Sequence, residues 1–536
     1  MTISFITSSL PEIVAPQEQE QAHLPAFFFG RMRQLPASDN PLYINGDDSS
    51  ETLTLDAAET MTARLASGLY HAAGVRPGHV VAIVMPNSIY YLPIILAVLT
   101  LGATCTLANP AYTARELAHQ LGDSQARLVI TIQALHPTVT EATGELANGD
   151  IPVLLADGDE SSLFDILSDR HVPLLPLDSV DGNSTAFIPY SSGTSGLPKG
   201  VKLSHRNIIS NILQTTAVHQ TAAADCRSAT IAVLPMFHIF GLLFLCFLMP
   251  ISGMTTVITR KFDMSQFLSL VKEHRVTETM LVPPIVNALA KMPQKTLTDC
   301  LSSLRWIVVG AAPLSPETIS MLESCLPGLA ILQGYGLTEA SPAISLNPPA
   351  AHNPTSAGRL LPSIDAKVID DRGKTLEAGQ TGELCFRGPN IMLGYLNNDE
   401  ATRDTIDQDG FLHTGDIGHI DEQQHVFVTD RKKELIKFNG FQVAPAELEG
   451  ILLQHANIRD CAVAGVFDQQ RQTEVPRAYL VMSSSLDHGD LDTAAQEAVD
   501  WVNGQVAYYK QLRGGFTLVN AIPRNASGKI LRRLLK

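Results

Sequence analysis

The stretch YSSGTSGLPKGV, residues 190–201, gathers glycines and short hydroxyl side chains around a single lysine. Glycine lets a backbone approach a ligand closely and aim its N–H groups at it. The hydroxyls add further donors, and Lys199 adds a point charge. These groups favour a loop that binds a polyphosphate; the alternative is a flexible serine and glycine turn. It is not a Walker A loop, because Lys199 is followed by Gly200 and not by serine or threonine.

Length, composition and charge describe a large folded protein. The chain has 536 residues, long enough for about three to four domain-sized units. Its formal net charge of -16 argues against a nucleic-acid partner, which needs a basic face. The 7 cysteines are odd in number and form no C-x-x-C pair, so neither a disulfide framework nor a zinc site is indicated. We therefore expect a reducing intracellular compartment.

Targeting signals and membrane spans are not indicated. The N-terminus has no basic start and fits neither a secretory signal nor a transit peptide. Leu534–Leu535–Lys536 does not match the S-K-L address, so we expect a cytoplasmic protein and leave a peroxisomal route open. The apolar runs 90–108 and 239–258 are interrupted by proline and glycine, which favours buried helix plus strand over membrane spans.

The order of the predicted elements indicates an α/β fold. Strand-like and helix-like segments alternate, which predicts a largely parallel sheet covered by helices on both faces. Strands are predicted within 79–87, 126–131 and 151–156 and at the start of 305–315, with a helix over 88–102. The loops 310–315 and 333–341 follow apolar runs, so we place them at the carboxyl edge of the strands, where ligands bind. Beyond Gly373, closely spaced glycines predict antiparallel strands. The charged segment 429–449 reads as an interdomain hinge or as a solvated turn before a helix near Pro445.

Five blocks together carry a family resemblance. They are YSSGTSGLPKGV, GYGLTEAS (334–341), HTGD (413–416), DRKKELIKFNGFQVAPAELE (430–449) and PRNASGKILRR (523–533). Their order resembles that of adenylate-forming enzymes, which include acyl-CoA synthetases, luciferases and the adenylation domains of peptide synthetases. The chain is most similar to 4-coumarate–CoA ligases and related aryl or acyl-CoA ligases, over nearly its whole length.

The resemblance implies a fold and a reaction. The fold would have a large N-terminal domain, 1–430, of stacked, mostly parallel sheets with helices and a β-rich subdomain. A small mobile α+β domain, 431–536, would follow a hinge near 430–434. The reaction would join an aryl or medium-chain carboxylic acid to coenzyme A, using ATP and Mg²⁺, through an acyl-adenylate. The resemblance implies no nucleic acid and no stable membrane insertion.

Two other functions stay open at this point. One is a stand-alone adenylating enzyme that loads the phosphopantetheine thiol of a separate carrier protein, or passes the acyl group to oxidation as luciferases do. The other is a non-catalytic nucleotide or acyl sensor. The joint presence of the polar residues that the reaction needs argues against a sensor. These residues are Lys199, Thr338, Glu339, Asp416, Arg431 and Lys529.

By resemblance, most site residues serve the nucleotide. The residues expected to bind the ATP phosphates are Ser191, Ser192, Gly193, Thr194, Ser195, Gly196, Lys199 and Thr338. Glu339 would bind Mg²⁺, and its alternative is a solvated carboxylate at a helix start. Asp416 would accept hydrogen bonds from the ribose, and its alternative is a turn aspartate. The adenine would lie between Tyr335, flanked by Gly334 and Gly336, and the loop Gly310, Ala311, Ala312 and Pro313.

The remaining residues serve the chemistry and the acid. Lys529 would bridge the carboxylate and the α-phosphate, and its alternative is a surface lysine of a basic tail. Arg431 would meet the nucleotide and Lys433 would lie at the hinge. Lys437, Gly440 and Gln442 would serve the thioester step or the adenylate. His238, which could equally be a core histidine, would line the acyl pocket with Phe240, Pro342 and Ala343; none of these three is ionisable, which favours an uncharged acid body.

Some positions depart from the family pattern. Ser195 stands where threonine is usual and keeps the hydroxyl, and Phe411 stands where tryptophan is common. Asn439 replaces a common lysine and so removes a charge near the expected coenzyme A channel. Phe240 and Ala343 replace the tyrosine and valine of plant coumarate ligases, so the resemblance does not specify coumarate.

Overall fold

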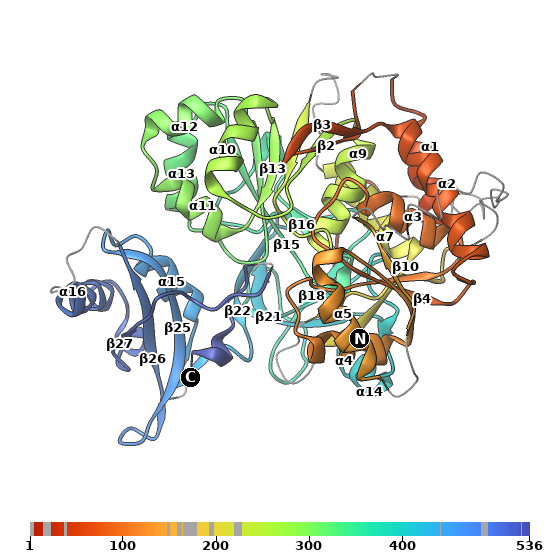
Figure 1. The fold of residues 1–536 in the computed structure, drawn as a ribbon. Helices are drawn as coiled ribbons and strands as arrows, with labels where there is room; N and C mark the ends of the chain where they lie inside the picture. The colour runs from red at the N-terminus through yellow and green to blue at the C-terminus, as the bar shows by residue number, and fades with distance from the viewer. Residues whose placement is uncertain are drawn as a thin grey trace.

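The computed structural model of the protein describes residues 5–13, 23–36, 40–146, 151–157, 163, 180–191, 198–218, 228–439, 441–483, 491–526 and 528–535. Six predicted site residues lie outside these ranges: Ser192, Gly193, Thr194, Ser195, Gly196 and Gly440. The ribbon shows a large body and, drawn in blue, a smaller C-terminal body beside it (Figure 1).

The first sheet of the large body has the strand order β20-β10-β8-β5-β4-β6-β7, with β9 paired to β10. Its central strands pair in parallel and β10 pairs antiparallel with its neighbours. The strands are β4 (Val80–Val84), β5 (Thr104–Leu107), β6 (Ala126–Thr131), β7 (Val153–Leu155), β8 (Thr185–Phe187), β9 (Tyr190–Ser191), β10 (Lys199–Ser204) and β20 (Gly394–Tyr395). The described phosphate-loop candidates Ser191 and Lys199 thus lie where this sheet turns antiparallel.

The second sheet has the order β17-β16-β15-β14-β13-β11-β12-β2-β3 and is parallel from β2 to β15. The strands are β2 (Tyr43–Asn45), β3 (Asp48–Leu53), β11 (Ala229–Ala232), β12 (Thr255–Ile258), β13 (Glu278–Leu281), β14 (Trp306–Val309), β15 (Ala330–Gly336), β16 (Ala343–Leu346) and β17 (Arg359–Leu360). β13 is buried throughout and β14 is an almost entirely buried apolar run, as expected of strands covered on both faces.

Helices cover these sheets. In Figure 1, α10 to α13 gather over one end of the large body, and α1 to α3 gather at the opposite side. The α-helices are α1 (Leu24–Met32), α2 (Leu55–His71), α3 (Tyr91–Thr100), α4 (Ala114–Ser124), α5 (His136–Gly144), α7 (His205–Val218), α8 (Ile239–Gly241), α9 (Met249–Ile251), α10 (Met264–Glu273), α11 (Pro283–Ala290), α12 (Gln294–Leu301), α13 (Pro316–Cys325) and α14 (Asp399–Thr405). Short helical turns are η2 (Gln133–Leu135), the π-helical η3 (Leu242–Leu248), η4 (Thr338–Ala340) and η5 (Pro349–Ala351).

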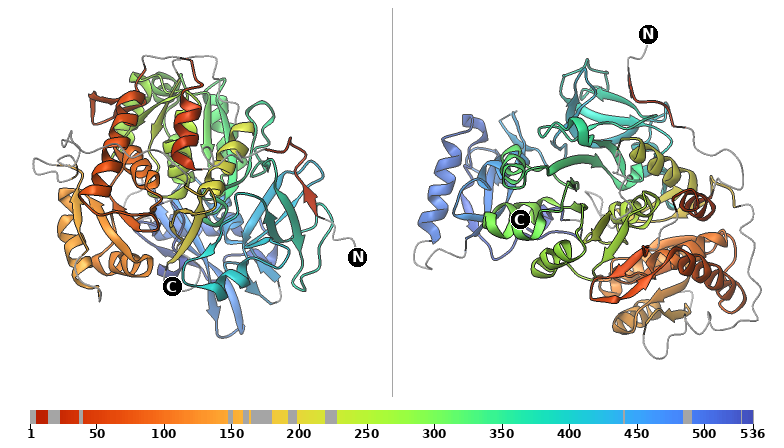
Figure 2. Two further views of the ribbon diagram at one scale, coloured as in Figure 1. Left: turned by 90° about the vertical axis from the view of Figure 1, so that its right-hand side faces the viewer. Right: turned by 90° about the horizontal axis from the view of Figure 1, so that it is seen from above.

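An antiparallel sheet of order β1-β18-β19-β21-β22 completes the large body and leads into the smaller one. Its strands are β1 (Ile6–Thr7), β18 (Asp365–Ile369), β19 (Gly382–Arg387), β21 (Leu412–Ile420) and β22 (Val426–Arg431). The smaller body contains β23 (Ile436–Phe438), β24 (Phe441–Val443), α15 (Pro445–Leu452), β25 (Ile458–Asp468), β26 (Thr473–Met482), α16 (Leu491–Asn503), η6 (Tyr508–Lys510), β27 (Phe516–Leu518) and η7 (Arg532–Leu534). Seen from above, it lies to one side of the large body (Figure 2).

The structure confirms the predicted fold class. The predicted strands over 126–131 and 306–309 coincide with β6 and β14, and the predicted helix over 88–102 contains α3. That helix ends where predicted, because Gly102 adopts the left-handed conformation with φ 65°. One boundary was wrong: residues 333–336 continue β15 and are not a loop, because they pair antiparallel with β16.

The two apolar runs fold as buried helix plus strand. Residues 90–108 contain α3, whose side chains are all buried, followed by β5. Residues 239–258 contain α8, η3, α9 and β12. In the part of the chain that is described, no helix is long and apolar enough to cross a membrane.

Candidate nucleotide and acyl site

The described ends of the phosphate loop come together on β9 and β10. Ser191 and Lys199 are cross-strand partners on these antiparallel strands. Lys199 Nζ lies 5.0 Å from the centre of the Tyr395 ring, a cation–π distance. Pro198 is fixed through its carbonyl oxygen, 3.2 Å from His119 Nε2. Lys199 is therefore held at the base of the loop, close to β20.

The Tyr395 ring also links Lys199 to the predicted metal ligand. The Tyr395 hydroxyl donates a 2.9 Å hydrogen bond to Glu339 Oε1, and Met392 N donates one to the Glu339 carbonyl oxygen at 2.9 Å. Among the described residues no group of three or more His, Cys, Asp and Glu side chains could hold a metal ion. A single carboxylate does fit Mg²⁺, which keeps waters and takes its other ligands from phosphate oxygens. Tyr395 was missed from the sequence, since nothing in its neighbourhood signals a partner at Glu339.

Asp416 is held by two side chains from different elements. It is the cross-strand partner of Arg431, and Arg431 Nε lies 3.1 Å from Asp416 Oδ1. The Tyr335 hydroxyl donates to Asp416 Oδ2 at 2.6 Å. Burial, followed by the Asp416 charge, raises the pKa of Tyr335 well above its usual range, so the hydroxyl stays protonated and donating. The structure thus joins three predicted nucleotide residues in one cluster.

Glycines at the end of β15 allow a close approach of backbones. A Cβ atom on Gly336 would lie 2.1 Å from the Pro342 carbonyl oxygen, so no other residue fits there. A Cβ atom on Gly334 would lie 3.1 Å from Leu346 Cδ1. Pro342 and Gly336 therefore define a tight fold-back of the chain, with Thr338 and Glu339 on η4 between them.

The loop after β14 faces this fold-back. Leu314 N donates to Gln333 Oε1 at 2.9 Å, which ties the end of the 310–313 loop to β15. Ala311 has φ 72°, a left-handed conformation that costs a non-glycine residue roughly 1–2 kcal/mol. A Cβ atom on Gly310 would lie 3.2 Å from Phe240 Cε1. The predicted adenine loop and the predicted acyl pocket therefore meet at Gly310.

His238 is the N-cap of α8, two residues before Phe240. Its Nδ1 accepts a 3.3 Å hydrogen bond from Phe240 N, so the ring proton of the neutral imidazole is on Nε2. Burial lowers the pKa of His238 to about 4, so the ring is neutral at physiological pH. The Phe240 ring meets the Phe244 ring edge to face at 5.1 Å, and Phe244 lies on the π-helix η3. The Phe240 and Phe244 rings thus form an apolar wall.

Two asparagines that were not predicted fix the neighbourhood of this wall. Asn211 on α7 accepts a hydrogen bond from Ala343 N at 2.9 Å and donates to the Ala343 carbonyl oxygen at 2.8 Å. Asn87 accepts one from Met236 N at 2.7 Å and donates to the Leu234 carbonyl oxygen at 2.9 Å. Both hold backbone segments from distant parts of the chain, which no local pattern reveals.

Lys529 reaches the Asp416 cluster from the small body. Its Nζ lies 3.9 Å from Glu434 Oε1, on the segment that joins the two bodies. Burial, followed by the positive charge of Arg431, lowers the pKa of Lys529 to about 8, and Glu434 and Asp416 act in the opposite direction. The side chain is therefore not part of a freely exposed basic tail.

The other predicted residues of the thioester step lie apart from this cluster. Lys437 and Gln442 are cross-strand partners on β23 and β24 and are exposed, as is Lys433. The backbone N of Lys437 donates to Glu474 Oε2 at 2.9 Å, within the small body. In this arrangement the structure groups Lys529, and not Lys437, with the nucleotide residues.

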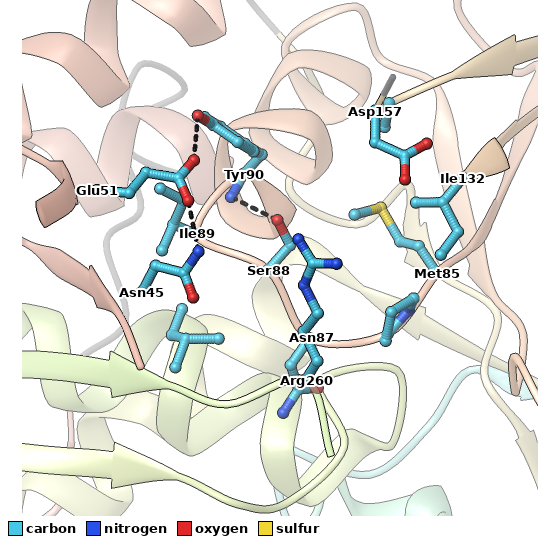
Figure 3. Close-up of a pocket in the computed structure, with 13 residues that line it drawn as sticks. Asn45, Glu51, Met85, Asn87, Ser88, Ile89, Tyr90, Ile132, Asp157 and Arg260 are labelled. Carbon is cyan, nitrogen blue, oxygen red and sulfur yellow. Dashed lines mark hydrogen bonds between the residues drawn. The ribbon is translucent and has the colours of Figure 1, made fainter. Parts of the chain in front are cut away.

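A separate small pocket opens at the carboxyl ends of β4, β6 and β12 (Figure 3). Glu51, Asp157 and Arg260 are among its lining residues, and Asn87 on its wall also contacts the segment before His238. None of the predicted site residues that the structure describes lines it.

Comparison with known proteins identifies the family. A model of the AMP-binding enzyme family matches residues 31–396, and a model of the AMP-binding enzyme C-terminal domain matches residues 447–529. The chain belongs to the AMP-binding enzyme family. Probable 4-coumarate–CoA ligase 1 of Dictyostelium discoideum is 37% identical over 554 residues, which cover 99% of this chain and 97% of the relative.

Solved structures of AMP-binding enzymes share the fold. The anthranilate CoA ligase AuaEII, in complex with anthranoyl-AMP, has a TM-score of 0.83 and 25% identity, covering 94% of this chain and 95% of that chain. O-succinylbenzoate coenzyme A synthetase from Bacillus subtilis, in complex with ATP and magnesium ion, has a TM-score of 0.78 and 27% identity, covering 95% of this chain and 98% of that chain. Members of this family therefore bind ATP and Mg²⁺. The protein is an AMP-forming enzyme of the acid–CoA ligase group, as the sequence predicted.

Proposed function

We propose that the protein joins an aryl or medium-chain carboxylic acid to coenzyme A. The observation that carries the proposal is the position of Lys529, whose ammonium lies 3.9 Å from Glu434 Oε1 and interacts electrostatically with Arg431 and Asp416, which pair with each other. Lys529 of the small body would therefore act together with the proposed nucleotide residues Asp416 and Arg431 of the large body. We assign residues 1–430 to the nucleotide- and acid-binding domain and 431–536 to a mobile domain, with the hinge near 430–434.

The first half-reaction forms an acyl-adenylate. A carboxylate oxygen attacks the α-phosphorus of ATP, the bond from that phosphorus to the bridging oxygen breaks, and pyrophosphate leaves. Lys529 would stabilise the charge that develops between the carboxylate and the α-phosphate, and losing such a preorganised donor commonly costs about 10²–10³ in rate. Asp416 would hold the ribose, while Lys199 and Thr338 would hold the phosphates. When bound, Mg²⁺ neutralises phosphate charge, and Glu339 is the chain's proposed ligand for it.

The second half-reaction forms the thioester. The thiol sulfur of coenzyme A attacks the acyl carbon, the carbon–oxygen bond to AMP breaks, and the thiol proton passes to solvent. Lys437, Gly440 and Gln442 are our candidates for this step. Because Lys437 and Gln442 are exposed and separate from Lys529, a rotation of the small domain would be needed to bring them to the adenylate.

The acyl pocket supports an uncharged acid. Phe240 and Phe244 form an apolar wall against Gly310, and His238 is neutral. A charged acid body would be buried there without a partner, which is costly. A flat ring or an unbranched chain suits a wall of this kind.

A product analysis tests the proposal. Purified protein, Mg-ATP and a panel of benzoates, cinnamates, phenylacetate and fatty acids of increasing length would be incubated with and without coenzyme A, and the products identified by mass spectrometry. We expect acyl-CoA from aryl or medium-chain carboxylic acids whose body, apart from the reacting carboxylate, carries no charge. An acyl-adenylate that accumulates despite coenzyme A would overturn the ligase proposal and indicate a carrier-protein acceptor. Tight ATP binding without either product would indicate a sensor.

A further inference from the structure

A lysine of the large domain crosses to the small domain at the end of α11. Lys291 follows the last residue of α11 and caps its C-terminus. Its Nζ donates to the Ile458 carbonyl oxygen at 2.8 Å and to the Arg459 carbonyl oxygen at 3.3 Å. Both carbonyls belong to the start of β25 in the small domain. Burial lowers the pKa of Lys291, and Cys461 and the Asp460 carboxylate partly offset this effect.

Asp460, the next residue of β25, connects this contact to the Lys529 loop. Arg524 Nη2 donates to Asp460 Oδ1 at 2.9 Å, and Arg524 Nη1 donates to the Gly528 carbonyl oxygen at 2.8 Å. The arginine thus spans from β25 to the residue immediately before Lys529. Its planar fork of donors suits such a double contact, and a lysine could not reproduce it.

The loop itself is closed by Asn525. Lys529 N donates to Asn525 Oδ1 at 2.8 Å, and Asn525 N donates to the Lys529 carbonyl oxygen at 2.9 Å. Gly528 has φ 83°, and a Cβ atom there would lie 3.3 Å from Val282 Cβ. Val282 is the N-cap of α11. The loop therefore packs against one end of the helix whose other end carries Lys291.

The same short helix thus contacts the small domain at both ends. Its eight residues span about 12 Å, since an α-helix rises 1.5 Å per residue. Two contacts separated in this way restrict the orientation of the small domain more than a single contact would. A rotation that moves the small domain away from α11 would break the Lys291 contact as well as the Val282 contact.

We propose that α11 sets the position of Lys529 for adenylate formation, with Lys291, Asp460 and Arg524 as positioning residues. The inference rests on the proposed role of Lys529. Lys291 touches no reacting atom: it holds β25, and β25 holds the Lys529 loop through the Asp460–Arg524 pair. Hydrogen bonds from a charged donor typically change an equilibrium by about 10- to 100-fold, so losing them shifts the balance of domain orientations by that factor.

Separate assays of the two half-reactions test the proposal. For Lys291→Met, we expect acid-dependent ATP–pyrophosphate exchange to fall about 10-fold or more, because the docked orientation is depleted. Thioester formation from added acyl-adenylate and coenzyme A should not fall, because that step does not use this orientation. Lys291→Arg keeps the charge and should restore most of the exchange. Lys295→Met is the matched control, since that side chain is 85% exposed and pairs only with Asp299 among the described contacts.

A double variant separates positioning from a general loss of structure. In a Lys529→Ala background, Lys291→Met should cause no further loss of exchange, because its effect passes through Lys529. An equal fall of both half-reactions, or a full additional loss in the double variant, would overturn the proposal. Unchanged exchange in Lys291→Met would do so too.

If no acid supports exchange, that result counts against the proposed function but does not test the positioning role. A distance measurement tests the positioning role without a substrate. Spin labels on non-natural amino acids at the exposed positions Met321 and Phe467 report the separation of the two domains. We expect one dominant distance in the unchanged protein and a depleted share of it in Lys291→Met. Identical distance distributions in both proteins would contradict the positioning role, whatever the acid turns out to be.

Discussion

The Lys529 ammonium lies 3.9 Å from the Glu434 carboxylate, so the last loop of the small domain meets the segment that joins the two domains. Glu434 also pairs with Arg532, which in turn binds Glu449 at 2.6 Å. The position of Lys529 is therefore linked to a buried charge network, and several consequences can be measured.

The pH dependence of adenylate formation should report the ionisation of Lys529. Burial, followed by the Arg431 charge, lowers the pKa of Lys529 to about 8, and only the protonated lysine can bridge two anions. The rate of ATP–pyrophosphate exchange should therefore be highest below that pH and fall as the pH rises through about 8. Lys529→Arg, which keeps its charge at all accessible pH values, should lose this alkaline limb. If the exchange rate of both proteins falls in the same way at alkaline pH, a group other than Lys529 causes that fall.

Removing the Asp416 charge should weaken ATP binding strongly, and removing the Tyr335 hydroxyl should not. Asp416→Ala loses the pair with Arg431 and the proposed ribose acceptor, so we expect the Kd for ATP to rise about 10- to 100-fold. Tyr335→Phe removes only the 2.6 Å donor to Asp416 Oδ2, which a ribose hydroxyl could replace, so the Kd should change less than about threefold. Isothermal titration calorimetry measures both. Equal effects would argue against ribose binding at Asp416.

Breaking the Arg532 network should destabilise the small domain. Arg532→Leu leaves the buried Glu449 without its ion-pair partner and leaves Glu434 with Lys529 alone; loss of a partner from a buried ion pair typically costs about 3–5 kcal/mol. Urea denaturation followed by tryptophan fluorescence should show the loss, since Trp501 lies on α16 of the same domain. Arg533→Leu is the matched control, because that neighbouring side chain is exposed; it should change the free energy of unfolding by less than about 0.5 kcal/mol. Similar losses for both variants would contradict the network.

Asn87 should affect use of the acid more than use of ATP. Asn87→Ala leaves Met236 N and the Leu234 carbonyl oxygen without their partner, which typically costs about 1–3 kcal/mol, and it loosens the segment that ends in His238. We expect kcat/KM for the acid to fall about 5- to 100-fold at an unchanged KM for ATP. Ser88→Ala, which alters the same pocket wall, should leave both values unchanged (Figure 3). If only the KM for ATP rises, the assignment of Asn87 to the acyl side of the site is contradicted.

The sequence predicted the elements whose signals are local. The buried runs of β6 and β14 and the helix start at Pro445 carry their own patterns, and the structure confirms them. It did not predict that β15 continues through Gly336, because this depends on pairing with β16. The same limit applies to the site: Asp416 and Lys529 lie in recognisable blocks, whereas Tyr395, Asn211 and Lys291 act through contacts with distant segments.

The most direct measurement is acid-dependent ATP–pyrophosphate exchange by the purified protein and by Lys529→Ala, with a panel of uncharged aryl and medium-chain acids. We expect exchange in the unchanged protein with at least one of these acids, and a fall of about 10²–10³ in the variant at an unchanged Kd for ATP. Exchange that survives in Lys529→Ala would contradict the assignment of Lys529, and no exchange with any acid of the panel would contradict the proposed substrate class.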